Sequence, residues 1–179
     1  MLEWLAMEFL GSHILSIDQF ERTDIEKIFT SSDALVPYAK RESITRVLQG
    51  AILSNMFFEP STRTRISFGS AFNILGGEVR ETTEIEATSL AKGESLYDTS
   101  RVLSGYSDVI VMRHPLAGSV AEFAEASRVP VINGGDGDNE HPSQALLDLF
   151  TIKKELESHN KEIDTARIAL IGDLSLIHI

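Results

Sequence analysis

A buried-type strand that runs directly into a helix constrains the fold of this 179-residue chain more than any other feature. Residues 50–58 (GAILSNMFF) are an apolar run bounded by turn signals, which predicts a buried strand. Apolar residues then recur at helical spacing from Ile66 to Leu75, and Gly76 and Gly77 end the pattern. Residues 58–65 (FEPSTRTR) between them are therefore expected to form a strand-to-helix turn.

This turn would place anion-binding groups where the helix begins. The first N–H groups of a helix have no backbone partner and lie at the positive end of its dipole, so they favour a phosphate. Ser61, Thr62 and Thr64 add hydroxyl donors, and the Arg63 guanidinium can bind a phosphate through two nitrogens. The alternative is that Ser61 or Thr62 caps an ordinary helix and the arginines are solvated. A Walker A phosphate loop is absent from the sequence, because no segment matches G-x-x-x-x-G-K-[ST].

Strand and helix patterns alternate along the rest of the chain. A helix is expected to start at Ser16 and to place Phe20, Ile25, Ile28 and Phe29 on one face. Further strands are expected at residues 78–83, 108–114, 129–133 and 167–172, and further helices at 94–107, 117–127 and 142–157. This alternation predicts an α/β fold with a parallel sheet that helices flank on both faces.

Three unrelated segments with polar ends should meet at one edge of that sheet. The turn at 58–65 follows the first strand, Arg113 ends the strand at 108–114, and a loop at 134–140 follows the strand at 129–133. Ligands of parallel sheets bind beyond the carboxyl ends of the strands. The sequence therefore predicts an anion-binding site at this edge.

Arg113, His141 and Gln144 are the other candidate site residues. Arg113 could instead pair with a surface carboxylate, and His141 could merely cap a helix or be solvated. In the functional interpretation, His141 donates to a carbonyl oxygen that becomes negative during acyl transfer. Gln144 lies one helical turn further on the same face, so its amide could accept from an adjacent NH₂ group.

These motifs together resemble the aspartate/ornithine carbamoyltransferase family. The turn at 58–65 (the octet) is similar to the family signature F-x-E-P-S-T-R-T-R. The segments VMRHP and HPSQ follow it in the family's order and at the family's spacing. The resemblance covers residues 12–174. It implies that the residues of the turn hold the phosphate of carbamoyl phosphate, that Arg113 contacts phosphate and carbonyl, and that His141 and Gln144 contact the carbamoyl oxygen and nitrogen. The residues that it assigns to phosphate binding are Ser61, Thr62, Arg63 and Thr64, and those that it assigns to catalysis are Arg63, Thr64, Arg113 and His141.

The segment at 88–94 (TSLAKGE) resembles the family's mobile loop, in which a serine and a lysine reach the active site of the neighbouring subunit. Ser89 and Lys92 match these roles, and the match implies a homotrimer. A flexible loop with one solvated lysine is the alternative. Regulatory chains are a further class of partner that the sequence leaves open.

Two details favour aspartate over ornithine as the second substrate. Ornithine enzymes usually carry a basic residue at or beside the position of Pro60, and they typically have Cys where this chain has Ser143. The resemblance then implies transfer of the carbamoyl group to the amino group of L-aspartate, which gives N-carbamoyl-L-aspartate and phosphate in pyrimidine (UMP) synthesis. An amine attacks the carbamoyl carbon directly, so neither a nucleophilic side chain nor a cofactor is expected.

Composition excludes several classes of partner. A net charge of −11 argues against a non-specific nucleic-acid surface or an anionic membrane surface. The chain has no cysteine, hence no disulfide or thiolate metal site, and no apolar stretch approaches the length of a membrane span. Residues 136–140 (DGDNE) resemble the start of a calcium loop, but His141 stands where that loop needs glycine, so no metal is expected. The cytoplasm is the expected compartment.

The expected domain organisation is a carbamoyl-phosphate-binding domain at 1–160, which includes the connecting helix at 142–157. Residues 161–179 are expected to hold the first strand of a truncated second domain, and the tail at 175–179 does not match the family. The fragment is expected to be inactive alone. Competing hypotheses are a non-catalytic phosphate-binding module, which has no use for His141 and Gln144, and a purely structural trimer-forming piece.

Overall fold

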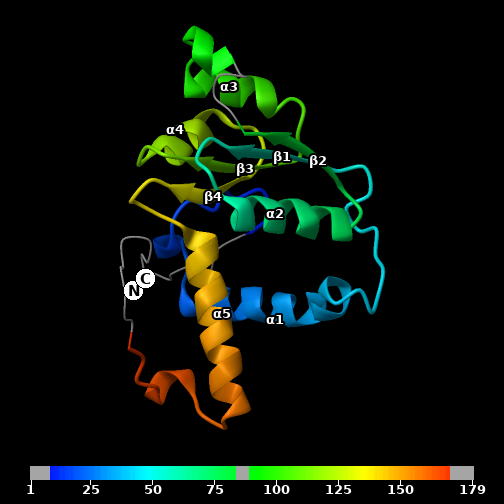
Figure 1. Cartoon of the computed structure of the whole chain (residues 1–179), viewed down its shortest axis with the longest axis vertical. Helices are drawn as coiled ribbons and strands as arrows, with labels where there is room; N and C mark the ends of the chain where they lie inside the picture. The colour runs from blue at the N-terminus through cyan, green and yellow to red at the C-terminus, as the bar shows by residue number, and fades with distance from the viewer. Residues whose placement is uncertain (1–8, 84–88, 170–179) are drawn as a thin grey trace, which may run out of the picture.

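The protein is built on a four-stranded parallel sheet (Figure 1). The computed structural model describes residues 9–83 and 89–169. Its strands lie in the order β2-β1-β3-β4. Their bounds are Ile52–Phe57 for β1, Glu78–Thr82 for β2, Val109–His114 for β3 and Val131–Asp136 for β4. The parallel sheet predicted from the alternating pattern is confirmed.

Helices cover both faces of the sheet, as expected for strands that are buried on both sides. Helix α2 (Thr62–Ile74) lies on one face, and α3 (Leu96–Leu103) and α4 (Ser119–Ala126) lie on the other (Figure 1). A right-handed crossover places its helix on the face set by the direction in which the chain moves along the sheet. In the strand order β2-β1-β3-β4, the connection from β1 to β2 through α2 runs toward one edge of the sheet. The connection from β3 to β4 through α4 runs toward the other edge, so these two helices lie on opposite faces.

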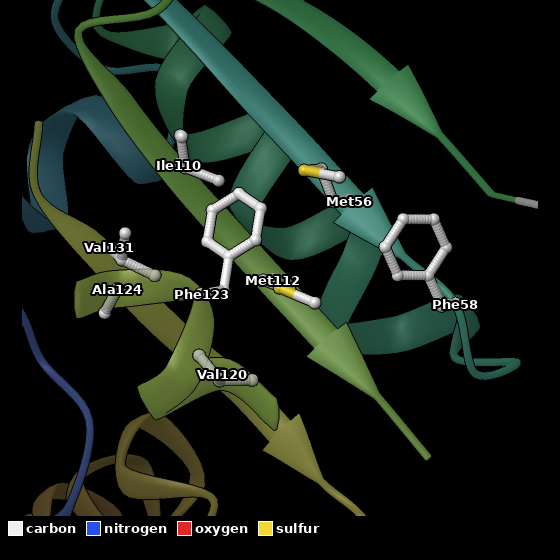
Figure 2. Close-up of a cluster of buried hydrophobic side chains, with 8 residues drawn as sticks. All are labelled: Met56, Phe58, Ile110, Met112, Val120, Phe123, Ala124 and Val131. Atoms are coloured by element: carbon white, nitrogen blue, oxygen red, sulfur yellow. The ribbon is translucent and has the colours of Figure 1, made fainter. Parts of the chain in front are cut away.

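The larger hydrophobic cluster fills the space between the sheet and α4. Phe123 is fully buried and lies over side chains from β1 and β3, as Figure 2 shows. Members of the cluster are Met56, Phe58, Ile110, Met112, Val120, Phe123, Ala124 and Val131. The opposite face is packed by Leu53, Phe57 and Val111 against Phe68 and Phe72 of α2. Alternate residues of each strand thus enter opposite layers.

Two longer helices cross beside α2. Helix α1 (Arg22–Ala39) contacts α5 (Pro142–Ser158) through an edge-to-face pair of Phe29 and Phe150, whose centroids are 5.3 Å apart. An ion pair of Lys154 and Asp33, 2.7 Å between Nζ and Oδ1, joins the same helices. Helix α5 leads away from the end of β4, so its first turn lies at the carboxyl edge of the sheet (Figure 1).

A short segment near the N-terminus covers the outer edge of β4. Ile14 bridges to Ile132 in parallel, with Ile14 N donating to Val131 O and Asn133 N donating to Ile14 O, each at 2.8 Å. The His13 ring accepts from Val131 N at 3.0 Å. These contacts satisfy backbone groups that an open strand edge would expose.

Some boundaries differ from the prediction. The helix expected to start at Ser16 is a 3-10 turn, η1 (Ile17–Gln19), and α1 begins separately after Glu21, whose backbone N–H bonds to Asp24. Strand β4 runs three residues beyond Asn133, to Asp136, and its pairing with β3 shifts register at Gly134 and Gly135. Helix α3 is shorter than expected, since its last turn ends at Ser104.

Other expectations lie at the limits of the described residues. The chain forms no strand over residues 167–169, and the remainder of the strand expected at 167–172 lies outside the described residues, together with the tail at 175–179. Residues 84–88 of the expected loop lie outside them as well, and the loop continues as a 3-10 turn, η3 (Ser89–Lys92). Within 9–83 and 89–169, no helix is both long and apolar enough to cross a bilayer.

The strand order creates one place where a ligand can enter between the loops. Strands β1 and β3 are neighbours, yet the connections that follow them leave toward opposite faces. Such a reversal opens a crevice at the carboxyl ends of the two strands. Glu59 follows β1 and Arg113 lies near the end of β3, so both border this crevice.

Candidate functional site

A cavity of about 720 Å³ lies at the carboxyl edge of the sheet. This volume is in the range of small-molecule sites. The cavity is bordered by the turns after β1, β3 and β4 and by the first turns of α2 and α5, and its lining residues are Glu59, Pro60, Ser61, Thr62, Arg63, Thr64, Arg113, Gly135, Gly137, Glu140, His141, Gln144 and Asp148. The residues singled out in the octet and in the two later motifs therefore meet at one place, as the strand-end argument predicts.

The start of α2 presents unoccupied donors to this cavity. Ser61 is the N-cap residue in an extended conformation (φ −153°, ψ 101°), and its hydroxyl makes no capping hydrogen bond. The simple capping role considered for Ser61 is therefore not what the structure shows. The hydroxyl and the first N–H groups of the helix are left available for an anion. Thr62 and Arg63 are exposed at the cavity wall.

Arg113 is held against the backbone of β4 and paired with Glu59. Its Nη2 donates to Glu59 Oε1 at 2.9 Å, and its Nη1 donates to Gly134 O at 3.3 Å. The two side chains are 12% and 29% exposed, so the pair is partly shielded from water. Among the described residues, the buried Nε of Arg113 and Oε2 of Glu59 have no hydrogen-bond partner. Unsatisfied buried groups of this kind often mark a functional site.

Gly135 makes room for that guanidinium. Its φ of +119° lies in a region that L side chains rarely adopt, and a Cβ there would lie 2.9 Å from Arg113 Nη1. Gly137 (φ +64°) is similar, because a Cβ would lie 2.6 Å from the carbonyl oxygen of Pro115. Glycine at these two positions therefore allows the close approach of the β3 and β4 ends.

His141 is the N-cap residue of α5 and lines the cavity beside Arg113. Burial, reinforced by the positive charge of Arg113, lowers the pKa of its imidazole from 6.5 to about 4. The ring is therefore neutral at pH 7 and carries one donor and one acceptor nitrogen. Its Nδ1 lies 3.3 Å from Ser143 Oγ, which orients the ring.

Gln144 lies one turn along α5, and its amide has a partner on the next turn. Nε2 of Gln144 donates to Asp148 Oδ1 at 2.8 Å. Both side chains are half-buried and line the same cavity. The donor end of the amide is thus occupied, whereas the carbonyl end remains an acceptor.

A buried carboxylate organises the loop that carries His141. Asp136 is 1% exposed, and its Oδ1 accepts from Asn133 Nδ2 at 3.0 Å and from Glu140 N at 2.9 Å. Its Oδ2 accepts from Gly118 N at 2.8 Å and from Asn139 Nδ2 at 3.0 Å. These bonds join the end of β4 to the start of α4 and close the loop before α5.

Lys92 lies apart from this group, and Ser89 precedes it in the same turn. Both belong to η3, and the Lys92 side chain is exposed and is not among the described residues that line the cavity. No described group of three or more His, Asp or Glu side chains is arranged to hold a metal ion. Residues 136–140, which resemble a calcium loop in sequence, are instead occupied with the hydrogen bonds of Asp136.

Sequence reasoning missed four residues that shape the cavity: Glu59, Gly135, Asp136 and Asp148. A signal existed for Asp148, because it stands four residues after Gln144 on one helix face. Glu59 and Arg113 are 54 residues apart, so no local pattern could pair them. In sequence, Asp136 stands out only as a possible metal ligand, whereas its partners in the structure are N–H groups.

The family profile described as "Aspartate/ornithine carbamoyltransferase, carbamoyl-P binding domain" matches residues 12–154. The chain belongs to this family. Its relatives include proteins named aspartate carbamoyltransferase catalytic subunit from Saccharophagus degradans, 73% identical over 168 residues, and from Archaeoglobus fulgidus, 52% identical over 162 residues. These alignments cover 94% and 90% of this chain but 50% and 53% of the relatives. The chain therefore spans about half the length of the curated relatives that it matches.

Solved structures of the family have the same fold. Aspartate transcarbamoylase of Trypanosoma cruzi in complex with carbamoyl aspartate and phosphate superposes with a TM-score of 0.78 at 42% identity, covering 88% of this chain and 49% of that one. The catalytic subunit of the enzyme of M. Jannaschii gives a TM-score of 0.76 at 45% identity, covering 82% and 48%. The fold predicted from the resemblance to carbamoyltransferases is confirmed.

Proposed function

We propose that this chain is the carbamoyl-phosphate-binding part of an aspartate carbamoyltransferase. One observation carries the proposal: the first turns of α2 and α5 and the guanidinium of Arg113 converge on a single cavity. Two helix N-termini and a partly shielded arginine favour a bound anion. Beside it, His141 adds an N–H that can donate to a carbonyl oxygen, and Gln144 adds an amide oxygen that can accept. The curated relatives named above support aspartate as the second substrate.

In the proposed reaction, Ser61, Thr62, Arg63 and Thr64 hold the phosphate group of carbamoyl phosphate. The amino group of L-aspartate attacks the carbamoyl carbon, forms a C–N bond and loses a proton, which the departing phosphate takes up. The C–O bond to phosphate breaks, and phosphate leaves with the bonding electron pair. Arg113 and the neutral His141 stabilise the negative charge that develops on the carbonyl oxygen. The product is N-carbamoyl-L-aspartate, and the proposed role is pyrimidine synthesis.

The remaining expectations belong to the same proposal. Ser89 and Lys92 are proposed to complete the cavity of a neighbouring subunit in a homotrimer. The exposure of Lys92 outside its own cavity supports this arrangement. The residues that bind the aspartate carboxylates are expected in a second domain beyond residue 160, and the cytoplasm is the expected compartment.

The test is thermal unfolding of the chain with and without fresh millimolar carbamoyl phosphate. A ligand that binds only the folded state stabilises it by about 2.7 kcal/mol at a hundred times its dissociation constant. Arg63→Ala should remove most of the shift, because it deletes the guanidinium at the cavity wall. Arg101→Ala is the matched control, since Arg101 is an exposed arginine on α3 that does not line the cavity.

The result separates the competing functions. A larger shift with carbamoyl phosphate than with inorganic phosphate supports the transferase, because His141 and Gln144 then contribute. Equal shifts with the two ligands would instead identify a phosphate-binding module without a use for the carbamoyl group. A folded chain that responds to neither ligand would refute the proposal.

A further inference from the structure

The orientation of one amide in the cavity is set by a neighbouring carboxylate. Gln144 Nε2 donates to Asp148 Oδ1 at 2.8 Å, across one turn of α5. A carboxylate is an acceptor only, so the side of the amide that faces it must be the NH₂ side. The carbonyl oxygen of Gln144 is then the end available to a ligand in the cavity.

This orientation has a chemical consequence for the ligand. An acceptor oxygen at this point favours a ligand group with an N–H, whereas it makes no hydrogen bond with a methyl group. It also disfavours a carboxylate oxygen, because two acceptors would face each other. His141 presents the complementary donor from the turn before, for a carbonyl oxygen beside that N–H.

We propose that Asp148 is a positioning residue that makes the cavity select a carbamoyl group over an acyl group of the same shape. It acts through Gln144, whose amide it holds with the oxygen toward the ligand. The inference rests on the proposed function and adds a determinant of substrate class to it. Carbamoyl phosphate is preferred, and an acyl phosphate with a methyl group in place of NH₂ binds more weakly.

A purely structural role for the pair is the competing explanation. Side-chain pairs four residues apart on an exposed helix stabilise it by only about 0.2–0.5 kcal/mol. Here both partners are half-buried at the cavity wall, and Asp148 itself lines the cavity. Asp148 also contributes negative charge near His141, but burial and Arg113 act more strongly on that ring. The two explanations differ in whether removal of Asp148 changes ligand preference.

The experiment compares two stable ligands that differ in one group. Phosphonoacetamide carries NH₂ beside its carbonyl, and acetonylphosphonate carries CH₃ at the same position. Inorganic phosphate is the third ligand, because it reports on the Ser61–Thr64 turn and Arg113 alone. Their dissociation constants are measured by calorimetry on the 179-residue chain. A single neutral hydrogen bond is expected to give the amide an advantage of about threefold to tenfold over the ketone.

Three variants isolate the carboxylate. Asp148→Ala should bring the ratio of the two dissociation constants close to one without weakening phosphate binding, because the amide of Gln144 is then free to turn over and a carboxylate has left the cavity wall. Asp148→Asn should restore part of the preference, since its amide oxygen can still accept from Gln144 Nε2. Glu155→Ala, which removes an exposed carboxylate from the same helix, should behave as the wild type.

Each outcome decides between the explanations. A preference that survives Asp148→Ala would overturn the inference while the proposed function stands. Equal binding of the two phosphonates by the wild type would overturn it in the same way, and so would an equal loss of all three ligands in the variant. Failure of the wild type to bind any of the three would refute the proposed function and the inference with it.

Discussion

A Cβ on residue 135 would lie 2.9 Å from Nη1 of Arg113, closer than side-chain carbons approach other atoms in folded proteins. The guanidinium of Arg113 therefore lies close to the backbone of β4, where Nη1 also donates to Gly134 O. Arg113 is the cation that β3 contributes to the cavity, and its position depends on residue 135 of β4 being glycine.

Gly135→Ala is expected to weaken phosphate binding by about tenfold, because the new methyl group displaces the guanidinium of Arg113, a charged hydrogen-bond donor. It should also destabilise the fold, since φ at this position is +119°. Calorimetry with inorganic phosphate measures the first effect and urea unfolding the second. Gly50→Ala is the control: its φ is +87° and nothing lies within 4 Å of the added Cβ, so stability should fall while phosphate binding is kept. Unchanged phosphate affinity in Gly135→Ala would contradict the close approach.

Glu59→Gln is expected to tighten phosphate binding by about threefold to fivefold, which is the range of a partly exposed ion pair. The carboxylate of Glu59 holds Arg113 Nη2 at 2.9 Å and repels an incoming anion, and the amide does neither to the same degree. Glu125→Gln on the exposed face of α4 is the charge-matched control. Weaker phosphate binding in Glu59→Gln would show that Glu59 chiefly positions the arginine.

Acidification is expected to lower the free energy of unfolding between about pH 6.5 and about pH 4. The pKa of His141 is lowered from 6.5 to about 4 in the folded chain, chiefly by burial. Above pH 6.5 the ring is neutral in both states and its contribution is complete. As the pH falls below 6.5, the unfolded chain takes up a proton that the folded chain refuses, so stability is lost.

Two other histidines act in the same direction, since burial also lowers the pKa of His13 and of His114. His141→Gln should therefore reduce the difference between unfolding free energies measured at pH 7 and pH 5 without abolishing it. A pH dependence that does not respond to His141→Gln would indicate that this ring takes up its proton at the same pH in the folded and unfolded chains.

Asp136→Asn is expected to destabilise the fold by about 2–3 kcal/mol, because an NH₂ group would then face N–H donors that the carboxylate now satisfies. The side chain is 1% exposed, so water cannot replace the lost acceptor. Urea unfolding measures the loss, and Asp138→Asn, an exposed change in the same loop, should be nearly neutral. Equal stability of the two variants would mean that the loop before His141 is held by other contacts.

The strands and helices around the site could be predicted because each carries a local signal. Residues 50–58 are mostly apolar, and α2 ends at Ile74 just before the two glycines that predict its end. Gly76 adopts φ +94°, the conformation that stops a helix. The same reasoning failed at Gly134 and Gly135, which look like a turn in sequence but remain in β4, where the pairing with β3 shifts register and Arg113 lies beside Gly135.

The contacts within the site were less predictable than its location. The rule on strand ends brings residues 61–64, Arg113 and His141 together without knowledge of any distance. It cannot reveal that the Ser61 hydroxyl makes no capping hydrogen bond or that Arg113 pairs with Glu59. Nor can it reveal that Asp136 accepts hydrogen bonds from two loops. Such partners depend on three-dimensional packing between segments that are far apart in the chain.

The reversal of the chain between β1 and β3 has a consequence for how the protein opens. Backbone pairing from Leu53 with Val109 to Phe57 with Arg113 joins two halves whose helices leave toward opposite faces. An anion bound by both the turn after β1 and Arg113 would hold the two halves together at the carboxyl end of the paired strands β1 and β3. Partial openings that separate the halves would then require release of the anion first, so amide hydrogens of β1 and β3 would exchange only through complete unfolding. Occupancy of the cavity would thereby extend cooperativity across the whole sheet.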